Sequence, residues 1–366
     1  MFKSDLSSSS VPPIHTRTPL AVIVLFLCLF AAAVSVGVAS RCTGSNTTLI
    51  ACSHQSLVLP KSNRTVFFQT PLGTPPRNGF PFAVFFQGSF ASPQFGWSVA
   101  AVVPLNGIQQ ADTFRALLDA GFAVLAPTAI RGLFWQTNLP PYNIFPNQWV
   151  NSDDHAMIVE LLDAANSPER RFGAPLDVSN AFAFGVSSGG YQSSRVAVDM
   201  SSRFRAVVVS NGAYMTCAGG LCLTPKTVAA KHSPTRFLYG RNDTLVPAQT
   251  TVDYYNALVR SNVSTDIVVC ATCAHEWIPG TADAVVSWFQ RFVVVSSSNN
   301  NSNDNSTSLA NSGAMLSASG LANTNASTAV TETSRDGSNR TRSAASSLMP
   351  SMSLTVTAIL LLSCRT

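Results

Sequence analysis

Charged residues are scarce in this chain of 366 residues: Asp, Glu, Lys and Arg together make up 11%, against roughly 25% in an average soluble domain. A highly charged disordered protein is therefore excluded. The 23 basic and 18 acidic residues give a net charge of +5, and no run of Lys and Arg is present, so the sequence shows no nucleic-acid-binding pattern. These absences favour a neutral or small substrate as the partner.

Charge is missing altogether from residues 20–38, which follow a polar start carrying Lys3, His15 and Arg17. This pattern predicts that residues 1–40 are a secretory targeting segment, either a cleaved signal peptide or an uncleaved anchor. The apolar run is longer than the roughly 7–15 residues of a typical signal peptide and close to the roughly 20 of a membrane span. In both cases the chain after Arg41 is expected in the lumen or outside the cell.

Aromatic residues nearly disappear after Val295, where Ser, Asn, Thr and Ala dominate. Residues 296–347 are therefore predicted to be a disordered stalk. Residues 348–366 form an apolar tail, and the small residues at 343–345 followed by a spacer resemble a glycolipid-anchor (GPI) signal, the alternative being a merely sticky tail. Eight N-x-Ser/Thr sequons are present, one of them at Asn242. The seven predicted glycosylation sites are Asn46, Asn63, Asn262, Asn300, Asn305, Asn325 and Asn339.

Six of the eight cysteines lie between the two terminal apolar segments, as three close pairs. An even number in a secreted chain favours disulfides. Fifteen pairings of six cysteines exist, and the shortest loops predict Cys42–Cys52, Cys217–Cys222 and Cys270–Cys273. The alternative is a zinc site formed by Cys270 and Cys273 with Cys217 and Cys222.

Residues 41–295 are predicted to form one domain of the α/β class. Short β-branched and aromatic runs alternate with helical patterns, which indicates a mostly parallel sheet with helices on both faces. Strands are expected at 56–59, 65–68, 82–86, 122–126, 181–186, 206–210, 236–239 and 267–270, and helices at 108–120, after 152–154, and at 191–200, 248–258 and 282–292.

The motif G-x-S-x-G occupies residues 185–189, between an expected strand and an expected helix. In this setting the central serine, Ser187, lies on a sharp turn with its hydroxyl exposed at the carboxyl end of the strand. The bare motif is weak evidence for a nucleophile, so it needs an acid and a histidine later in the chain.

Both partners follow in the required order. Asp243 comes directly after one expected strand and His275 shortly after the next, so all three side chains are expected at one edge of the sheet. In this arrangement His275 accepts the Ser187 proton and Asp243 orients the imidazole. The competing residues fit worse, because they lie before the nucleophile, outside the core, within a helix or at the wrong end of a strand; they are Asp153, Asp154, Asp266, His15, His54, His155 and His232.

An oxyanion formed at Ser187 needs two backbone N–H donors. The first is expected from Ser188, the residue after the nucleophile. The second is expected from the turn after strand 82–86, with the Ser89 amide preferred and Phe90 as the alternative.

Residues 185–191, 243–247 and 275–280 together resemble the α/β-hydrolase esterases related to secreted polyhydroxybutyrate depolymerases and feruloyl or acetylxylan esterases. The resemblance covers roughly residues 80–292, and its most specific part is the His-x-Trp followed by Pro-Gly. The chain departs from the family in carrying Gln87 where a histidine usually precedes the glycine, and in the inserted Ile278. The resemblance implies a serine hydrolase of esters that needs neither a metal nor an organic cofactor.

Aromatic residues gather in the loop 132–149, which leaves a strand at the expected catalytic edge. Trp135, Tyr142 and Trp149, together with Trp277 beside His275, are candidate substrate contacts, because aromatic faces suit sugar rings, aromatic acyl groups and polyester chains. The alternative is a hydrophobic plug over the sheet.

The sequence as a whole predicts a secreted or surface-anchored serine hydrolase that cleaves carboxylic esters, small or polymeric, through an acyl-enzyme. The alternatives are a peptidase of the same fold and a non-catalytic surface binding protein on a hydrolase scaffold.

Overall fold

A computed structural model of the chain describes residues 40–45, 47–100, 103–217, 222–229 and 231–295. All of them belong to one unit of the chain, Met1–Ser298. Nearly all of the predicted targeting segment, the whole stalk and tail, and the sequons at Asn46, Asn300, Asn305, Asn325 and Asn339 lie outside the described residues. Among the helices within these ranges, none is long and apolar enough to cross a membrane.

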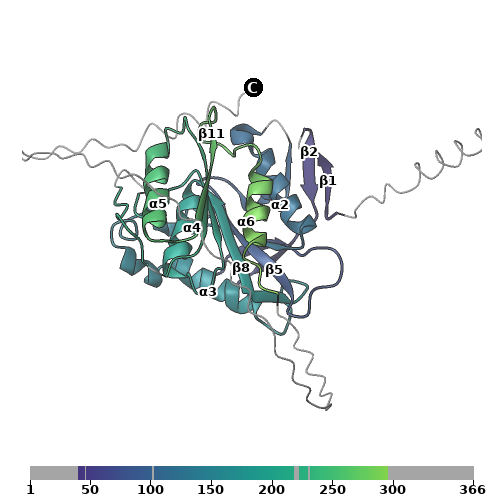
Figure 1. Cartoon of the computed structure of the whole chain (residues 1–366). Helices are drawn as coiled ribbons and strands as arrows, with labels where there is room; N and C mark the ends of the chain where they lie inside the picture. Colours follow the sequence, from purple (N-terminus) through teal and green to yellow (C-terminus); the bar gives the residue numbers. More distant parts are fainter. Residues whose placement is uncertain (1–39, 46, 101–102, 218–221, 230, 296–366) are drawn as a thin grey trace, which may run out of the picture. The chain divides into compact units, whose positions relative to one another are not determined.

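The centre of the domain is an eight-stranded sheet with the order β11-β10-β9-β8-β5-β7-β4-β3 (Figure 1). Strands β11 to β7 in this order are parallel, whereas β4 and β3 are antiparallel additions at one edge. The strands are β3 (Gln55–Val58), β4 (Thr65–Gln69), β5 (Phe80–Phe86), β7 (Ala123–Pro127), β8 (Leu176–Val186), β9 (Val207–Ser210), β10 (Thr235–Gly240) and β11 (Thr265–Cys270).

Strand β5 shows why the sheet lies in the middle of the domain. Its sequence is apolar without a break, which suits a strand covered on both faces. Because successive side chains point to opposite faces, Phe82, Val84 and Phe86 enter one hydrophobic core, while Ala83 and Phe85 enter another on the opposite face.

Helices cover both faces of the sheet (Figure 1). Helices α3 (Asp153–Ala165), α4 (Ser188–Asp199) and α5 (Ala248–Arg260) pack into the core that contains Phe82. Helices α2 (Ile108–Asp119) and α6 (Thr281–Gln290) pack into the core that contains Phe85. The expected α/β-hydrolase architecture, a mostly parallel sheet between two helical layers, is confirmed.

A second, smaller sheet was not expected from the sequence. It consists of β1 (Cys42–Ser45), β2 (Leu49–Cys52) and β6 (Ser98–Ala100), all antiparallel. Four short 3-10 helices lie in the loops of the described residues: η1 (Pro93–Gly96), η2 (Pro104–Asn106), η3 (Gln136–Asn138) and η4 (Pro146–Asn151).

The six cysteines of the domain pair as predicted: Cys42 with Cys52, Cys217 with Cys222, and Cys270 with Cys273. The zinc alternative is therefore wrong, because the four sulfurs it needs are held in two disulfides. Cys42 and Cys52 face each other across β1 and β2.

Candidate active site

Ser187 occupies the sharp turn between β8 and α4, with φ 56° and ψ −120°. A non-glycine residue with positive φ is strained, and such strain often marks a functional turn. The helix begins at Ser188, directly after the turn, rather than at Tyr191 as expected. Neighbouring glycines make room: a Cβ at Gly189 would lie 1.9 Å from the Phe86 carbonyl oxygen, and one at Gly185 would lie 2.4 Å from that of Gly189.

Ser187, His275 and Asp243 form a continuous hydrogen-bonded chain. The Nε2 atom of His275 lies 2.9 Å from Ser187 Oγ, and its Nδ1 lies 2.8 Å from Asp243 Oδ2. The three residues follow the carboxyl ends of β8, β11 and β10, which lie on one side of the parallel sheet. The sheet topology thus brings together residues separated by up to 88 positions in the chain.

Backbone hydrogen bonds hold the Asp243 carboxylate in place beside the imidazole. Its Oδ1 accepts the backbone N–H groups of Leu245 and Val246, each at 2.9 Å, while Oδ2 faces His275. The side chain is 1% exposed, and that of His275 is 13% exposed. A buried carboxylate held in this way favours the tautomer with the proton on Nδ1, leaving Nε2 free to accept the serine proton.

The competing carboxylates and histidines within the described residues lie elsewhere. Asp266 pairs with Arg236 at 2.6 Å near the start of β11, and the buried Asp154 pairs with Arg64 at 2.6 Å. His232 lies shortly before β10, and its Nε2 forms a hydrogen bond with the Tyr254 hydroxyl. His15 lies outside the described residues.

Tyr191 lines the same site, and its hydroxyl does not act as a base. Burial, with the neighbouring Asp243 adding to it, raises the pKa of the Tyr191 hydroxyl well above its usual range. The hydroxyl donates to the Cys217 carbonyl at 3.4 Å. It therefore stays protonated and contributes to the wall of the site.

Ser188 and Ser89 both line the site, and their backbone N–H groups have no hydrogen-bond partner among the described residues. The turn that carries Ser89 lies against the nucleophile, since a Cβ at Gly88 would be 3.7 Å from the Ser187 Cβ. The alternative donor Phe90 is excluded, because its N–H donates to the Leu133 carbonyl at 2.7 Å. Ser188 and Ser89 therefore remain the predicted oxyanion donors.

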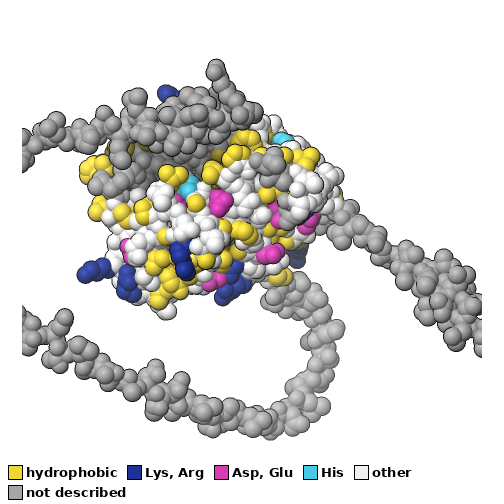
Figure 2. Space-filling view, turned by 90° about the horizontal axis from the view of Figure 1, so that it is seen from above, with side chains coloured by type: hydrophobic (Ala, Val, Ile, Leu, Met, Phe, Trp, Pro, Cys, Tyr) yellow, Lys and Arg dark blue, Asp and Glu magenta, His cyan; other side chains and the backbone are white. Residues whose placement is uncertain are grey.

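A pocket of about 420 Å³ opens around this chain of residues. Beyond Ser187 and His275, its lining combines polar side chains, an apolar segment and a disulfide; the residues are Ser89, Asn138, Ser188, Tyr191, Cys217, Cys222, Leu245, Val246, Pro247 and Thr250. Among the described residues of this lining, none is Lys, Arg, Asp or Glu. Figure 2 shows a face of the molecule where hydrophobic and uncharged side chains cover most of the described surface, while Lys and Arg gather along one edge.

The aromatic candidates for substrate contact do not line this pocket, and for the three tryptophans the prediction is wrong. Trp135 and Trp149 are 0% exposed and Trp277 is 4% exposed. Trp135 packs on Phe86, Trp149 lies under the Arg195 guanidinium, and Trp277 packs on Phe85. Indole rings that fill the cores leave no surface for a substrate, so the alternative of a hydrophobic plug describes them.

Tyr142 is half-buried and packs against the core, and its backbone carbonyl accepts a hydrogen bond from the Arg195 guanidinium at 2.7 Å. The pocket residues that sequence reasoning missed come from separate loops and helices, as Asn138, Tyr191 and Thr250 show. Only Asn138 lies within the loop that the sequence singled out. Tyr191 ends the motif 185–191 without having been predicted to line the site, and nothing in the local pattern of Thr250 marks it.

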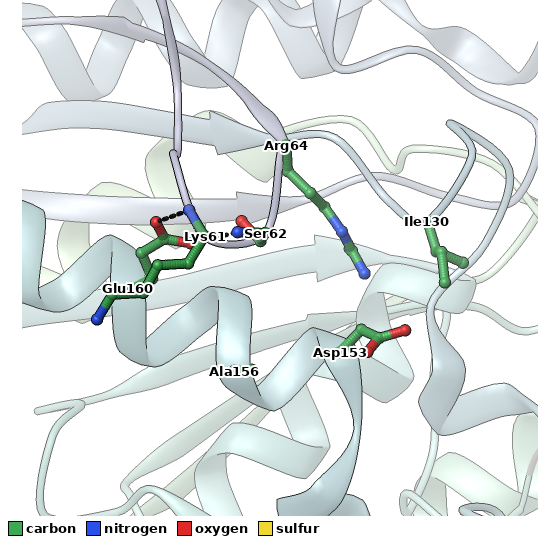
Figure 3. Close-up of a pocket in the computed structure, with 7 residues that line it drawn as sticks. All are labelled: Lys61, Ser62, Arg64, Ile130, Asp153, Ala156 and Glu160. Carbon is green, nitrogen blue, oxygen red and sulfur yellow. Dashed lines mark hydrogen bonds between the residues drawn. The ribbon is translucent and has the colours of Figure 1, made fainter.

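A second cavity of about 290 Å³ lies between the β3–β4 turn and α3 (Figure 3). Its Glu160 carboxylate accepts the backbone N–H groups of Lys61 at 2.7 Å and Ser62 at 2.8 Å. Burial alone would raise the pKa of Glu160, but these hydrogen bonds outweigh it and lower that pKa. The carboxylate thus fastens a turn to a helix.

An elbow serine, a histidine and a buried carboxylate at one edge of a mostly parallel sheet define an α/β-hydrolase. No family model matches the chain. The chain is 37% identical over 281 residues to the poly(3-hydroxyoctanoate) depolymerase of Pseudomonas fluorescens, a match covering 75% of this chain and 98% of that protein. The chain therefore belongs to the family of this depolymerase, which confirms the resemblance seen in the sequence.

Solved structures of two esterases are also similar to the chain. The Bacillus cereus carboxylesterase is 14% identical with a TM-score of 0.43, covering 64% of this chain and 97% of that one. The acetyl xylan esterase of Paenibacillus sp. R4 is 13% identical with a TM-score of 0.42, covering 77% of this chain and 97% of that one.

Proposed function

We propose that the protein hydrolyses carboxylic esters through Ser187, with His275 as general base and acid and Asp243 as its orienting carboxylate. The observation that carries the proposal is the unbroken Ser187–His275–Asp243 hydrogen-bonded chain beside two free backbone amides. A non-catalytic binding protein has no need of this arrangement. The alignment of Ser187, His275 and Asp243 supports acyl transfer to the serine.

In the first half of the reaction, Ser187 Oγ attacks the ester carbonyl carbon while its proton passes to His275 Nε2. The carbonyl oxygen becomes an oxyanion that the Ser188 and Ser89 N–H groups stabilise, and Asp243 stabilises the imidazolium. When the intermediate collapses, the ester C–O bond breaks and His275 returns the proton to the leaving alcohol. An acyl group remains on Ser187.

In the second half, a water molecule takes the place of the alcohol. His275 accepts one water proton as the oxygen attacks the acyl carbon, and the same two amides hold the new oxyanion. The Ser187–acyl bond then breaks, the proton returns to Ser187, and a carboxylic acid leaves.

The pocket favours an uncharged acyl chain with a substantial apolar part. Leu245, Val246 and Pro247 give the pocket lining an apolar part. Among the described lining residues, none other than a protonated His275 could pair with a charge on the substrate. The relative from Pseudomonas fluorescens is named for a polyester of hydroxyoctanoate units. We therefore assign esters of uncharged, medium-length acyl groups, polymeric or small, as substrates.

The test compares p-nitrophenyl acetate, butyrate and octanoate as substrates of the purified protein, with a fluorophosphonate probe for the nucleophile. Ser187→Ala is expected to lower kcat by about 10⁴-fold or more and to abolish labelling, because the nucleophile is lost. The matched control is Ser193→Ala, which removes a buried serine hydroxyl from α4 without a partner among the described residues. Normal labelling of Ser187→Ala, or cleavage of peptides in preference to esters, would overturn the assignment.

We further propose that the enzyme works at the cell surface or in the surrounding medium. The apolar run at 20–38, the sequons and the small residues at 343–345 before an apolar tail support delivery to the surface and a glycolipid anchor. Disulfides are typical of oxidising compartments, and three pair here. Phosphatidylinositol-specific phospholipase is expected to release the protein from cells. Failure of release, with release instead on replacing residues 1–40 by a cleavable signal, would place the anchor at the N-terminal segment.

A further inference from the structure

One fully buried amide side chain holds the turn that carries the Ser89 N–H. Gln87, at the end of β5, is 0% exposed. Its Nε2 donates to the carbonyls of Ala91 and, at 3.1 Å, Gly132, while its Oε1 accepts the Ala129 N–H at 3.4 Å. A glutamine side chain is well suited to such a link because it donates and accepts at once. The side chain therefore ties the turn 87–91 to the segment 129–138.

The main chain of the same turn is tied to the same segment. The Trp135 indole Nε1 donates to the Gln87 carbonyl at 2.8 Å, and the Phe90 N–H donates to the Leu133 carbonyl at 2.7 Å. Trp135 is itself fixed by its packing on Phe86. The turn thus contacts segment 129–138 through its main chain as well as through the Gln87 side chain.

The far end of segment 129–138 reaches the other oxyanion donor. The Asn138 side chain donates from Nδ2 to Ser188 Oγ, and the Trp135 backbone N–H lies 3.5 Å from the same oxygen. The segment therefore contacts both Ser188 and the turn that carries Ser89. It bridges the two pocket residues proposed as oxyanion donors.

We propose that Gln87 is a positioning residue for the hydrolysis: by fastening the turn 87–91 to segment 129–138, it sets the separation between the Ser89 and Ser188 N–H groups. The proposal rests on the function proposed above. Gln87 touches no substrate and acts through the Ser89 amide. In this proposal, segment 129–138 fixes the distance between the two oxyanion donors. It replaces the substrate-binding role that the aromatic residues of the loop suggested.

The physical basis is the sensitivity of oxyanion stabilisation to distance. Donors act when they lie about 2.7–3.1 Å from the developing oxyanion, and a displacement of about 1 Å can cost about 100-fold in rate. Since the oxyanion exists only in the tetrahedral state, a displaced donor lowers kcat and leaves substrate binding nearly unchanged.

The test uses the full-length enzyme and Gln87→Met, which keeps the length of the side chain and removes its hydrogen bonds. We expect kcat to fall about 10- to 100-fold with KM within about twofold. Inhibition by an alkyl boronic acid, whose tetrahedral adduct with Ser187 places an oxygen between the two amides, is expected to weaken by a similar factor. The matched control is Gln69→Met in β4, because Gln69 is also buried and bonds Ser53 and Thr70 away from the pocket.

A second variant, Trp135→Phe, tests the same contact from the other side. It keeps an aromatic ring against Phe86 and removes the donor to the Gln87 carbonyl, so the same split between kcat and KM is expected. Trp97→Phe is its control, since Trp97 is equally buried and its Nε1 has no partner among the described residues. Because Gln87 and Trp135 hold one turn, their double variant should lose less than the product of the single losses.

The outcomes separate this proposal from the one on which it rests. If Gln87→Met and Trp135→Phe lower only the melting temperature, with kcat per fluorophosphonate-titrated serine and boronate inhibition unchanged, Gln87 is structural and the proposal is overturned. If Ser187→Ala keeps esterase activity, the proposed function itself fails. Equal losses in Gln87→Met and Gln69→Met would also overturn the positioning role.

Discussion

His275 and His232 have nearly the same hydrogen bonding and very different surroundings. His275 lies between the Asp243 carboxylate and the Ser187 hydroxyl, at 2.8 and 2.9 Å, and lines a pocket of about 420 Å³. His232 lies between the Ser233 carbonyl and the Tyr254 hydroxyl, at 2.7 and 2.6 Å, in the core under α5. Hydrogen bonds at both ring nitrogens therefore do not by themselves identify a catalytic histidine.

The difference follows from the position of each residue relative to its strand. His275 follows the carboxyl end of β11, whereas His232 precedes β10. In a parallel sheet these are opposite edges, and only the carboxyl edge also receives the elbow serine. At the other edge, burial lowers the pKa of His232 to about 4 and keeps the ring neutral.

The largest effect is expected from changing the partner of His275 alone. Asp243→Asn keeps the size of the side chain but favours the wrong imidazole tautomer, so we expect kcat to fall about 10⁴-fold with a nearly unchanged melting temperature. Asp266→Asn is the matched control, since its carboxylate pairs with Arg236 away from the pocket. Activity of Asp243→Asn within tenfold of the wild type would show that another group orients His275.

His232 is expected to affect stability in acid and not the chemistry. Its folded pKa of about 4 lies below the unfolded value of about 6.5, so its stabilising effect is complete above pH 6.5 and is lost as the pH falls toward 4, where only the unfolded chain binds the proton. The loss amounts to about 3 kcal/mol. Urea unfolding at pH 7 and pH 4 measures it.

His232→Gln should therefore lose less free energy of unfolding than the wild type between these two pH values, with kcat at pH 7 retained. The exposed His54 provides the control variant His54→Gln, which should keep the wild-type pH dependence. A wild-type pH dependence in His232→Gln would mean that other groups account for the loss.

A smaller effect should come from the disulfide beside His275. The carbonyls of Cys270 and Cys273 accept the N–H groups of Arg241 and Asn242, at 2.9 and 3.0 Å, so this turn contacts the loop that leads to Asp243. We expect Cys270→Ser/Cys273→Ser to lower kcat about 3- to 10-fold through a displaced base. Closing so short a loop should contribute to stability only at the low end of the general range of about 0–5 kcal/mol.

The disulfide Cys42–Cys52 sharpens this expectation because it closes a longer loop in the smaller sheet. Cys42→Ser/Cys52→Ser should show the opposite split, with a lower melting temperature and an unchanged kcat. If the Cys270/Cys273 variant has normal kcat and a strongly reduced melting temperature, that disulfide stabilises the fold and does not position His275.

Much of the site could be predicted from the sequence because its signals are local. Ser187 lies between two glycines at a strand–helix junction, and Asp243 and His275 each follow a short apolar strand in the expected order. The cysteine pairs were predictable for the same reason, since each partner is the nearest available sulfur. In these cases the relevant neighbours lie within about ten residues or are set by strand direction.

Tertiary structure alone decided which residues of the aromatic loop line the pocket and which are buried. Trp135 and Trp149 share a loop with Asn138, yet the indoles are buried and the amide lines the pocket. Composition cannot separate these fates, because an indole gains free energy from burial in a core as well as from contact with a ligand. The outcome depends on distant partners such as Phe86 and Arg195, which only the packing of the sheet and its helices brings to the loop.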